Sequence, residues 1–196
     1  MKNSITRLIF LIALAGTLSA CQSDGRIPVD PNTPVAAGSV RTNIKSPDVS
    51  KWQVVSRTAN GLVYNCRQLA CSDGVMVTGE SERAPTSKPD PEALKKLAAG
   101  KPTKSTVGTE LKGVGGTVTK EDKIDGHVTT IKGYPTVSVA FRVETDNKVT
   151  IYTVRHAIFA KSALIKLTAV SVSRAAAEKA LREFEGALEI TEGAAN

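Results

Sequence analysis

The clearest pattern of apolar and polar positions lies in the last third of the chain. Between residues 137 and 143 every second residue is apolar, which predicts a strand with one buried face. A turn at 145–148 separates this strand from a second apolar segment at 149–160, and a third follows at 163–172. Together these segments predict a three-stranded antiparallel meander.

A closing helix is predicted from Ser173 onward. Its apolar residues are spaced by four, three and four positions, so they form one stripe that packs against the sheet. The stripe consists of Ala177, Leu181, Phe184 and Leu188. The charged residues of the helix are expected on a solvated outer face, and they are Arg174, Glu178, Lys179, Arg182 and Glu185.

Shorter apolar segments precede this region. Strands are predicted at 52–56, 62–66 and 72–79. Asn60-Gly61 is a turn signal between the first two strands, which indicates a hairpin. A short helix is predicted at 90–100, because Asp90-Pro91 suits a helix start and Gly100 suits its end.

Two stretches show no clear period. Residues 80–91 are polar and rich in structure breakers, and residues 101–133 are rich in Gly, Lys and Thr. Loops are expected there, with one or two short strands near 114–118 and 128–131. The predicted fold class is α+β: an antiparallel sheet of about five to seven strands, on which the C-terminal helix and the short insertion helix pack.

The first twenty residues have the three parts of a secretory signal. Lys2 and Arg7 precede an apolar run at 8–15, and small residues follow. A transmembrane helix needs about 20 apolar residues, so this run is too short for a permanent span. Residues 1–20 are therefore predicted to be a signal peptide.

The residues that end this signal, Leu18-Ser19-Ala20-Cys21, resemble the lipobox of bacterial lipoproteins. The resemblance implies cleavage between Ala20 and Cys21, diacylglycerol on the Cys21 thiol, and a further acyl chain on the freed amine. Two or three chains matter, because a single chain binds membranes only marginally. Gln22 is the residue after the cysteine. In enteric bacteria an aspartate at this position resembles an inner-membrane retention signal, and this chain has glutamine there instead. The expected location is therefore the outer membrane, facing the periplasm or the cell surface. The alternative is an ordinary signal peptide with a chance cysteine at its cleavage site.

Residues 21–50 are expected to form the lipidated N-terminus and a flexible tether, since they contain four prolines and no apolar period. A single domain is expected at 51–191 and a disordered tail at 192–196. Loss of Lys2 and Arg7 with the signal lowers the formal net charge from +7 to +5. This modest excess suits a position near anionic lipid or cell-wall polymer. There is no basic stripe with interleaved aromatic residues, so nucleic acid is not an expected partner.

The assignment of Cys21 to lipid leaves Cys66 and Cys71 as a pair in an oxidising compartment. A disulfide is predicted, which clamps the turn at 67–70 between two strands. The alternatives are a redox-active pair or half of a metal site.

Histidines are scarce, and no hydrolase signature such as G-x-S-x-G or H-E-x-x-H occurs. His127 follows Asp125-Gly126 and is expected in a turn. His156 is expected to be a hydrogen-bonded structural histidine at a sheet edge or under the helix. No catalytic residue, metal or cofactor is assigned.

Four lysines form a basic region near the short helix, namely Lys95, Lys96, Lys101 and Lys104. The simple interpretation is a solvated face. The alternative is a contact surface for anionic headgroups or cell-wall polymer, which predicts weaker binding as the salt concentration rises.

The order of an early hairpin, a helical insertion and a meander with its closing helix resembles the PsbP-like fold. Gly133-Tyr134-Pro135 matches the segment that often opens the central hairpin of that fold. The chain also resembles small uncharacterised lipoproteins of alphaproteobacteria, in the segments around Cys66 to Cys71 and at 184–190. The resemblance implies partner binding rather than catalysis, and it carries over no residue role.

The expected function is that of a lipid-anchored, non-enzymatic envelope protein that binds an envelope protein or polymer, or presents its domain at the cell surface. The alternative is an envelope hydrolase, or an accessory subunit of a cell-wall or transport complex. A cleft with convergent polar groups and a perturbed titratable residue favours this alternative. An exposed apolar patch on a closed sheet and helix sandwich favours binding.

Overall fold

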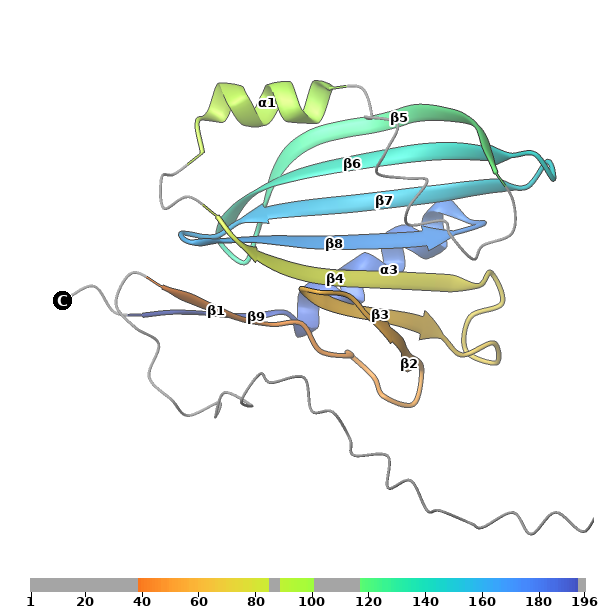
Figure 1. The fold of residues 1–196 in the computed structure, drawn as a ribbon, viewed down its shortest axis with the longest axis horizontal. Coiled ribbons are helices and arrows are strands. Elements are labelled where there is room, and N and C mark those ends of the chain that lie inside the picture. The colour runs from red at the N-terminus through yellow and green to blue at the C-terminus, as the bar shows by residue number, and fades with distance from the viewer. Residues whose placement is uncertain (1–38, 85–88, 101–116, 194–196) are drawn as a thin grey trace, which may run out of the picture. The chain divides into compact units, whose positions relative to one another are not determined.

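A seven-stranded antiparallel sheet forms the centre of the computed structural model, which describes residues 39–84, 89–100 and 117–193 (Figure 1). Its strands, in the order in which they lie side by side, are β2 (Trp52–Arg57), β3 (Gly61–Cys66), β4 (Val75–Arg83), β8 (Ala163–Ser171), β7 (Thr150–Phe159), β6 (Tyr134–Thr145) and β5 (Val118–Ile131). The predicted α+β class with an antiparallel sheet is confirmed. Within the described ranges, no helix is long and apolar enough to cross a membrane.

The predicted meander is confirmed by strands β6, β7 and β8, which pair in sequence. Alternation along β6 divides its side chains between the two faces of the sheet. Ala140 belongs to the main core beneath the C-terminal helix, whereas Phe141 and Val143 belong to a second apolar cluster. The alternating pattern in the sequence therefore reflects burial on both faces.

The C-terminal helix α3 (Arg174–Ala187) covers one face of the sheet and lies behind it in Figure 1. Ser173 caps it, because its side chain accepts a hydrogen bond from the backbone N–H of Ala176. The apolar stripe is buried as predicted, and Phe184 is fully buried. The Phe184 ring contacts those of Trp52 and Tyr64, with centroid distances of 5.0 and 4.9 Å. This aromatic cluster joins α3 to the early hairpin.

The short helix α1 (Pro91–Ala99) packs on the other face, along the β5 and β6 side of the sheet (Figure 1). Its buried residues Leu94 and Ala98 contact Val137 of β6. A Cβ atom at Gly126 of β5 would lie 2.2 Å from the Ala98 carbonyl oxygen. Only glycine therefore allows the end of α1 to approach β5 this closely.

Two strands are longer than predicted. β5 runs over fourteen residues, where short strands at 114–118 and 128–131 were expected, and β4 extends past Gly79 to Arg83. β5 is an edge strand with largely exposed side chains and two register shifts, near Val118 and Lys123. These features remove the strict two-residue period on which a strand prediction depends.

A second, two-stranded sheet consists of β1 (Val40–Asn43) and β9 (Glu189–Glu192). The Gly193 N–H extends this ladder by donating to the Ser39 carbonyl. The predicted tether at 21–50 and tail at 192–196 are therefore wrong at these boundaries. Both strands are short and polar, and their pairing joins residues about 150 positions apart, so neither segment carries a local signal. Residues 21–38 lie outside the described ranges.

Glu192 of β9 connects this small sheet to the main one. The Tyr134 hydroxyl donates to Glu192 Oε1 at 2.8 Å, and Lys161 Nζ lies 2.6 Å from Glu192 Oε2. Desolvation raises the pKa of Tyr134 to about 12, with further contributions from the hydrogen bond and the charge of Glu192. The neutral phenol is therefore favoured in the folded protein.

We expect Tyr134 to make the fold sensitive to alkali. A phenol whose pKa is about 12 when folded and 10 when unfolded stabilises the fold below pH 10 and loses that contribution as the pH rises to 12. The loss amounts to about 2 kcal/mol. Tyr134→Phe removes the hydrogen bond, at a cost of about 1 kcal/mol at pH 8, and removes this pH dependence. Urea unfolding of both proteins at pH 8, 10 and 11.5 measures the difference, and equal losses in the two proteins would contradict the assignment.

Candidate functional site

A cleft of about 380 Å³ lies between α3 and the β5, β6 and β7 side of the sheet. Both histidines of the chain line it, His127 from β5 and His156 from β7. Ser138 of β6 lies between them, because it pairs with His127 across one ladder and with His156 across the next. Directly paired residues share a face of the sheet, so these three side chains lie in one row.

The helix side of the cleft carries charged residues spaced by four, four and three positions. They are Arg174, Glu178, Arg182 and Glu185. This spacing places them on one flank of α3. The predicted solvated face holds for the exposed Arg182 but is wrong for Glu185, whose side chain is largely shielded in the cleft. The sequence pattern did not predict that His127, Ser138 and His156 lie side by side. Only the register of the paired strands β5, β6 and β7 shows this arrangement.

Glu185 and His156 form the most shielded pair of polar side chains in the cleft. Glu185 Oε1 lies 2.6 Å from His156 Nδ1, and the two side chains are 19% and 14% exposed. The two atoms face each other, but neither has a hydrogen-bond partner among the described residues. The position of His156 under the helix agrees with the prediction, whereas the predicted hydrogen bond is not found for its Nδ1 atom among the described residues.

Asp125 and Arg174 tie β5 to the start of α3. Arg174 Nη2 lies 3.2 Å from Asp125 Oδ2, and Arg174 Nε donates to Glu178 Oε1 at 2.7 Å. Desolvation raises the pKa of Asp125, but the N–H of Gly126, the His127 ring and the Arg174 charge together outweigh it, so this pKa lies below its usual value. The hydrogen bond to Glu178 raises the pKa of Arg174. The cleft therefore holds opposite charges that are already paired.

His127 occupies the exposed side of the cleft. Its Nδ1 lies 3.6 Å from Asp125 Oδ1, and its side chain is 55% exposed. The predicted turn is wrong, because Asp125 and Gly126 continue β5 beyond a register shift instead of reversing the chain. A local break in the strand resembles a turn in sequence, since both contain Asp and Gly.

The chemistry of this arrangement suits binding better than catalysis. Ser138, His156 and Glu185 have the residue types of a nucleophile, a base and an orienting acid. However, β6 pairs with strands on both sides, so its ladder occupies the backbone N–H groups that would stabilise an oxyanion. Ser138 is also 7% exposed. Among the residues that the structure describes, no group of three or more His, Cys, Asp or Glu side chains could hold a metal ion.

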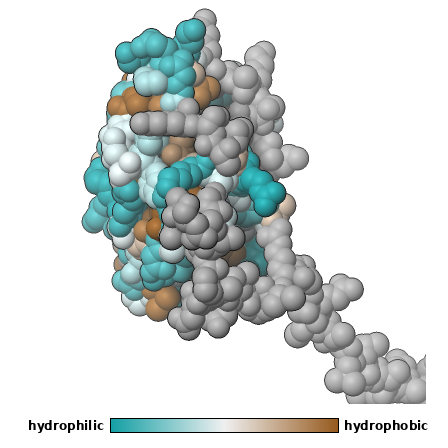
Figure 2. Space-filling model, turned by 90° about the vertical axis from the view of Figure 1, so that its left-hand side faces the viewer, coloured by the Kyte–Doolittle hydropathy of each residue, from teal (hydrophilic) through white to brown (hydrophobic). Residues whose placement is uncertain are grey.

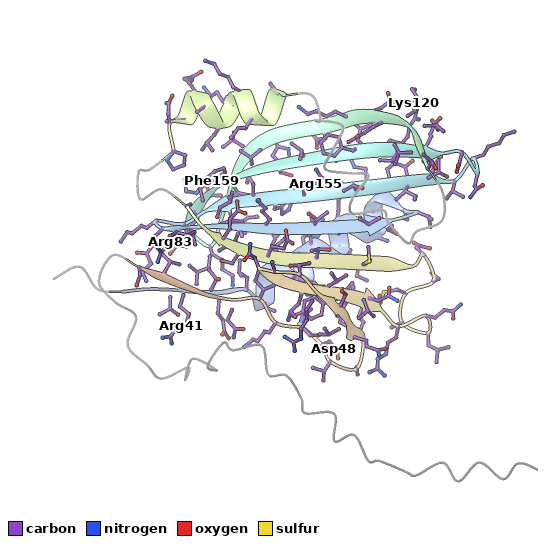
Figure 3. The ribbon with its side chains drawn as sticks, viewed as in Figure 1. Arg41, Asp48, Arg83, Lys120, Arg155 and Phe159 are labelled. Carbon is purple, nitrogen blue, oxygen red and sulfur yellow. A yellow bond between two sulfur atoms is a disulfide. The ribbon has the colours of Figure 1, made fainter. Side chains whose placement is uncertain are left out.

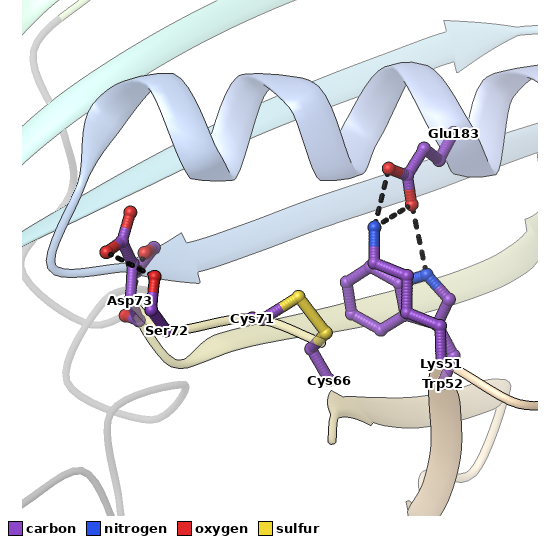
Figure 4. Close-up of a disulfide and its surroundings, with 8 residues drawn as sticks. Lys51, Trp52, Cys66, Cys71, Ser72, Asp73 and Glu183 are labelled. Carbon is purple, nitrogen blue, oxygen red and sulfur yellow. Dashed lines mark hydrogen bonds and ion pairs between the residues drawn. A yellow bond between two sulfur atoms is a disulfide. The ribbon is translucent and has the colours of Figure 1, made fainter. Parts of the chain in front are cut away.

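Cys66 and Cys71 form a disulfide, which confirms the predicted pairing (Figure 4). A second hollow, of about 310 Å³, lies beside this disulfide. Glu183 of α3 accepts hydrogen bonds from Lys51 Nζ at 2.7 Å and from the Trp52 indole at 3.1 Å. The two cysteines are five positions apart, and closure of so short a loop stabilises the fold by about 2 kcal/mol. These contacts fasten the early hairpin beneath α3.

A third hollow, of about 390 Å³, is a mainly apolar groove lined by residues of β2, β4, β7 and β8. Val55 and Val172 line it and are each about half exposed. An exposed apolar surface on a sheet and helix sandwich is a feature of proteins that bind partners.

The other residues assigned from sequence fall into two groups. Lys95 and Lys96 are exposed on α1, where Lys95 Nζ lies 2.8 Å from Glu92 Oε1. Ala20, Cys21, Lys101 and Lys104 lie outside the described residues. The basic contact surface and the lipidation site therefore stay predictions.

No family model and no curated protein matches this sequence. Among solved structures, the chain is similar to the solution structure of cyanobacterial PsbP (CyanoP) from Synechocystis sp. PCC 6803. The identity is 13%, the match covers 84% of this chain and 99% of that chain, and the TM-score is 0.47. The chain is also similar to PA94 from Pseudomonas aeruginosa, a protein of unknown function described as a putative regulator, with 10% identity, coverage of 82% and 84%, and a TM-score of 0.34. No residue role is transferred from either structure.

Proposed function

We propose that this chain is a lipid-anchored protein of the bacterial envelope, held at the outer membrane, whose domain binds an envelope protein or polymer without catalysing a reaction. The anchor is Cys21, which follows Leu18-Ser19-Ala20 at the end of an apolar signal. The residues between Cys21 and Val40, where the described fold begins, give the domain a spacer from the bilayer.

The observation that carries the binding role is the charged cleft beneath α3. Asp125, Arg174 and Glu178 are held by ion pairs within the domain, so they need little reorganisation when a partner enters. His127 and Arg182 are exposed and present donors at its mouth. A polar segment that carries both acceptors and donors complements such a surface.

One observation favours a second candidate, an envelope hydrolase or an accessory subunit of a cell-wall or transport complex. Ser138 lies next to His156, and His156 contacts Glu185. Asp125, with its lowered pKa, supplies the perturbed titratable group expected near an active site. Binding is preferred because β6 pairs with β5 and β7, so its ladder occupies the backbone donors that an oxyanion would need.

Crosslinking in intact envelopes, followed by recovery of the tagged chain, tests the binding role. The test variant combines His127→Ala with Arg182→Ala, and the matched control combines Arg67→Ala with Lys148→Ala, which are exposed residues away from the cleft. We expect the test variant to recover about tenfold less of a specific crosslinked partner, which corresponds to a loss of about 1.4 kcal/mol in binding free energy. Truncation of the few side chains that dominate an interface, among which arginine is enriched, costs at least this much. The control should match the wild type.

Equal recovery by the test variant and the wild type would exclude the cleft as the binding surface. Labelling of the wild type by a fluorophosphonate probe, with loss of labelling in Ser138→Ala, would instead support the hydrolase. Under the binding proposal no such labelling is expected.

A further inference from the structure

The chain enters the described fold at one end of the molecule. Val40 begins β1 and pairs with Glu192, the last residue of β9. Everything upstream of Val40, including Cys21, is therefore attached to the domain at this point. We call this part of the surface the entry end.

Contacts of Glu192 show what surrounds the entry end. Its carboxylate holds Tyr134, which follows the turn between β5 and β6, and Lys161, which lies in the turn between β7 and β8. The end of β4 lies here too, because Arg83 pairs with Ala163. Arg41 and Arg83 accordingly lie toward the same end of the ribbon in Figure 3.

The charges at the entry end are mainly positive. Four basic side chains belong to it, namely Arg41, Arg83, Lys132 and Lys161. Lys132 Nζ donates to the neutral Gly186 carbonyl, so its charge is not cancelled by that contact. The nearby Lys166 and Glu82 neutralise each other at 2.8 Å. Glu192 offsets the charge of Lys161, whereas Arg83 and Lys132 form no ion pair with an acidic side chain among the described residues, so the excess charge of this end comes from these two cations.

The visible described residues of this end are of mixed polarity. Figure 2 shows the entry end facing the viewer, with apolar residues in separate patches between polar ones. Such a surface does not favour insertion into the hydrocarbon of a bilayer. It suits contact with charged headgroups, which attract basic residues within about a Debye length.

We propose that the entry end lies against the anionic lipid headgroups of the membrane that holds the anchor. This inference rests on the proposed lipid anchor. A tether that starts at the bilayer and joins the domain at its basic end keeps that end at a high local concentration near the headgroups. The turn between β6 and β7, at the opposite end of these strands, then faces away from the membrane.

Lysine footprinting on the full lipidated chain tests this orientation. The protein is reconstituted into vesicles of neutral lipid, or of neutral lipid with about 30% anionic lipid, floated, and treated with an uncharged acetylating reagent before mass spectrometry. Anionic lipid should slow acetylation of Lys132 and Lys161 at least about threefold, and about 0.5 M salt should abolish this protection. Lys148 is the internal control, because it is exposed in a turn at the opposite end and, like Lys132, has a positive φ.

A pair of matched variants tests the contribution of charge. Arg83→Gln with Lys132→Asn removes two charges from the entry end, and Arg67→Gln with Lys148→Asn removes two from the opposite end. Each basic residue near an anionic surface strengthens the contact about fivefold, so only the first variant should lose protection at Lys161. Asparagine tolerates the positive φ at both lysine positions.

The outcomes separate the orientation from the anchor. A chain that does not float with vesicles overturns both proposals. A chain that floats, but shows equal acetylation of Lys132 on neutral and anionic vesicles, overturns only the orientation. Equal protection of Lys148 and Lys132 also overturns it, because the contact would then involve no particular end.

Discussion

Replacement of Phe184 with alanine should lower the free energy of unfolding by about 4 kcal/mol, the largest stability change expected in this protein. The ring is fully buried in α3 and contacts both Trp52 and Tyr64. Its removal deletes two aromatic contacts and leaves a cavity at the junction of the helix with the early hairpin. Urea unfolding followed by circular dichroism measures the change.

Phe159→Ala is the matched control for this prediction. Phe159 is only partly buried and packs on the opposite face of the sheet, beside α1. Its loss should cost about 1–2 kcal/mol, because less apolar surface returns to water. If Phe184→Ala costs no more than Phe159→Ala, the aromatic cluster does not hold α3 on the sheet.

Cys21→Ser should move the chain from the detergent phase to the aqueous phase after cloud-point separation. Each buried methylene contributes about 0.8 kcal/mol, so two or three acyl chains give a preference for the membrane of many orders of magnitude. Immunoblotting of the two phases measures the distribution.

A double variant, Cys66→Ser with Cys71→Ser, is the control for cysteine loss. It removes the disulfide and lowers stability by about 2 kcal/mol, but it leaves Cys21 intact. It should remain in the detergent phase. If Cys21→Ser partitions as the wild type does, the lipid anchor at this residue is excluded.

The part of the fold that the sequence predicts is the part with a strong local period. Strands β6 to β8 alternate on buried faces, and α3 carries an apolar stripe, so both were found with nearly correct bounds. β5 was missed as a long strand because edge position, exposure and register shifts weaken its alternation. β1 and β9 were missed because their pairing depends on the folded positions of the two chain ends.

The candidate site was less predictable than the fold. His127 and His156 are 29 positions apart, and Ser138 comes between them only through the register of two ladders. Glu185 was predicted on the solvated face of the helix. Helical periodicity shows on which side of the helix a residue lies, but it does not show which strand packs beside that side. Cys66 and Cys71, in contrast, could be paired from their spacing and the expected compartment alone.

The intact mass of the chain isolated from bacterial envelopes tests the central proposal most directly. We expect a protein that begins at Cys21 and carries the added mass of a diacylglycerol group, with or without a further acyl chain on the amine. Digestion should place the whole addition on the N-terminal peptide. A mature chain with an unmodified Cys21, or one that begins at another residue, would contradict the lipid anchor and the orientation of the domain that depends on it.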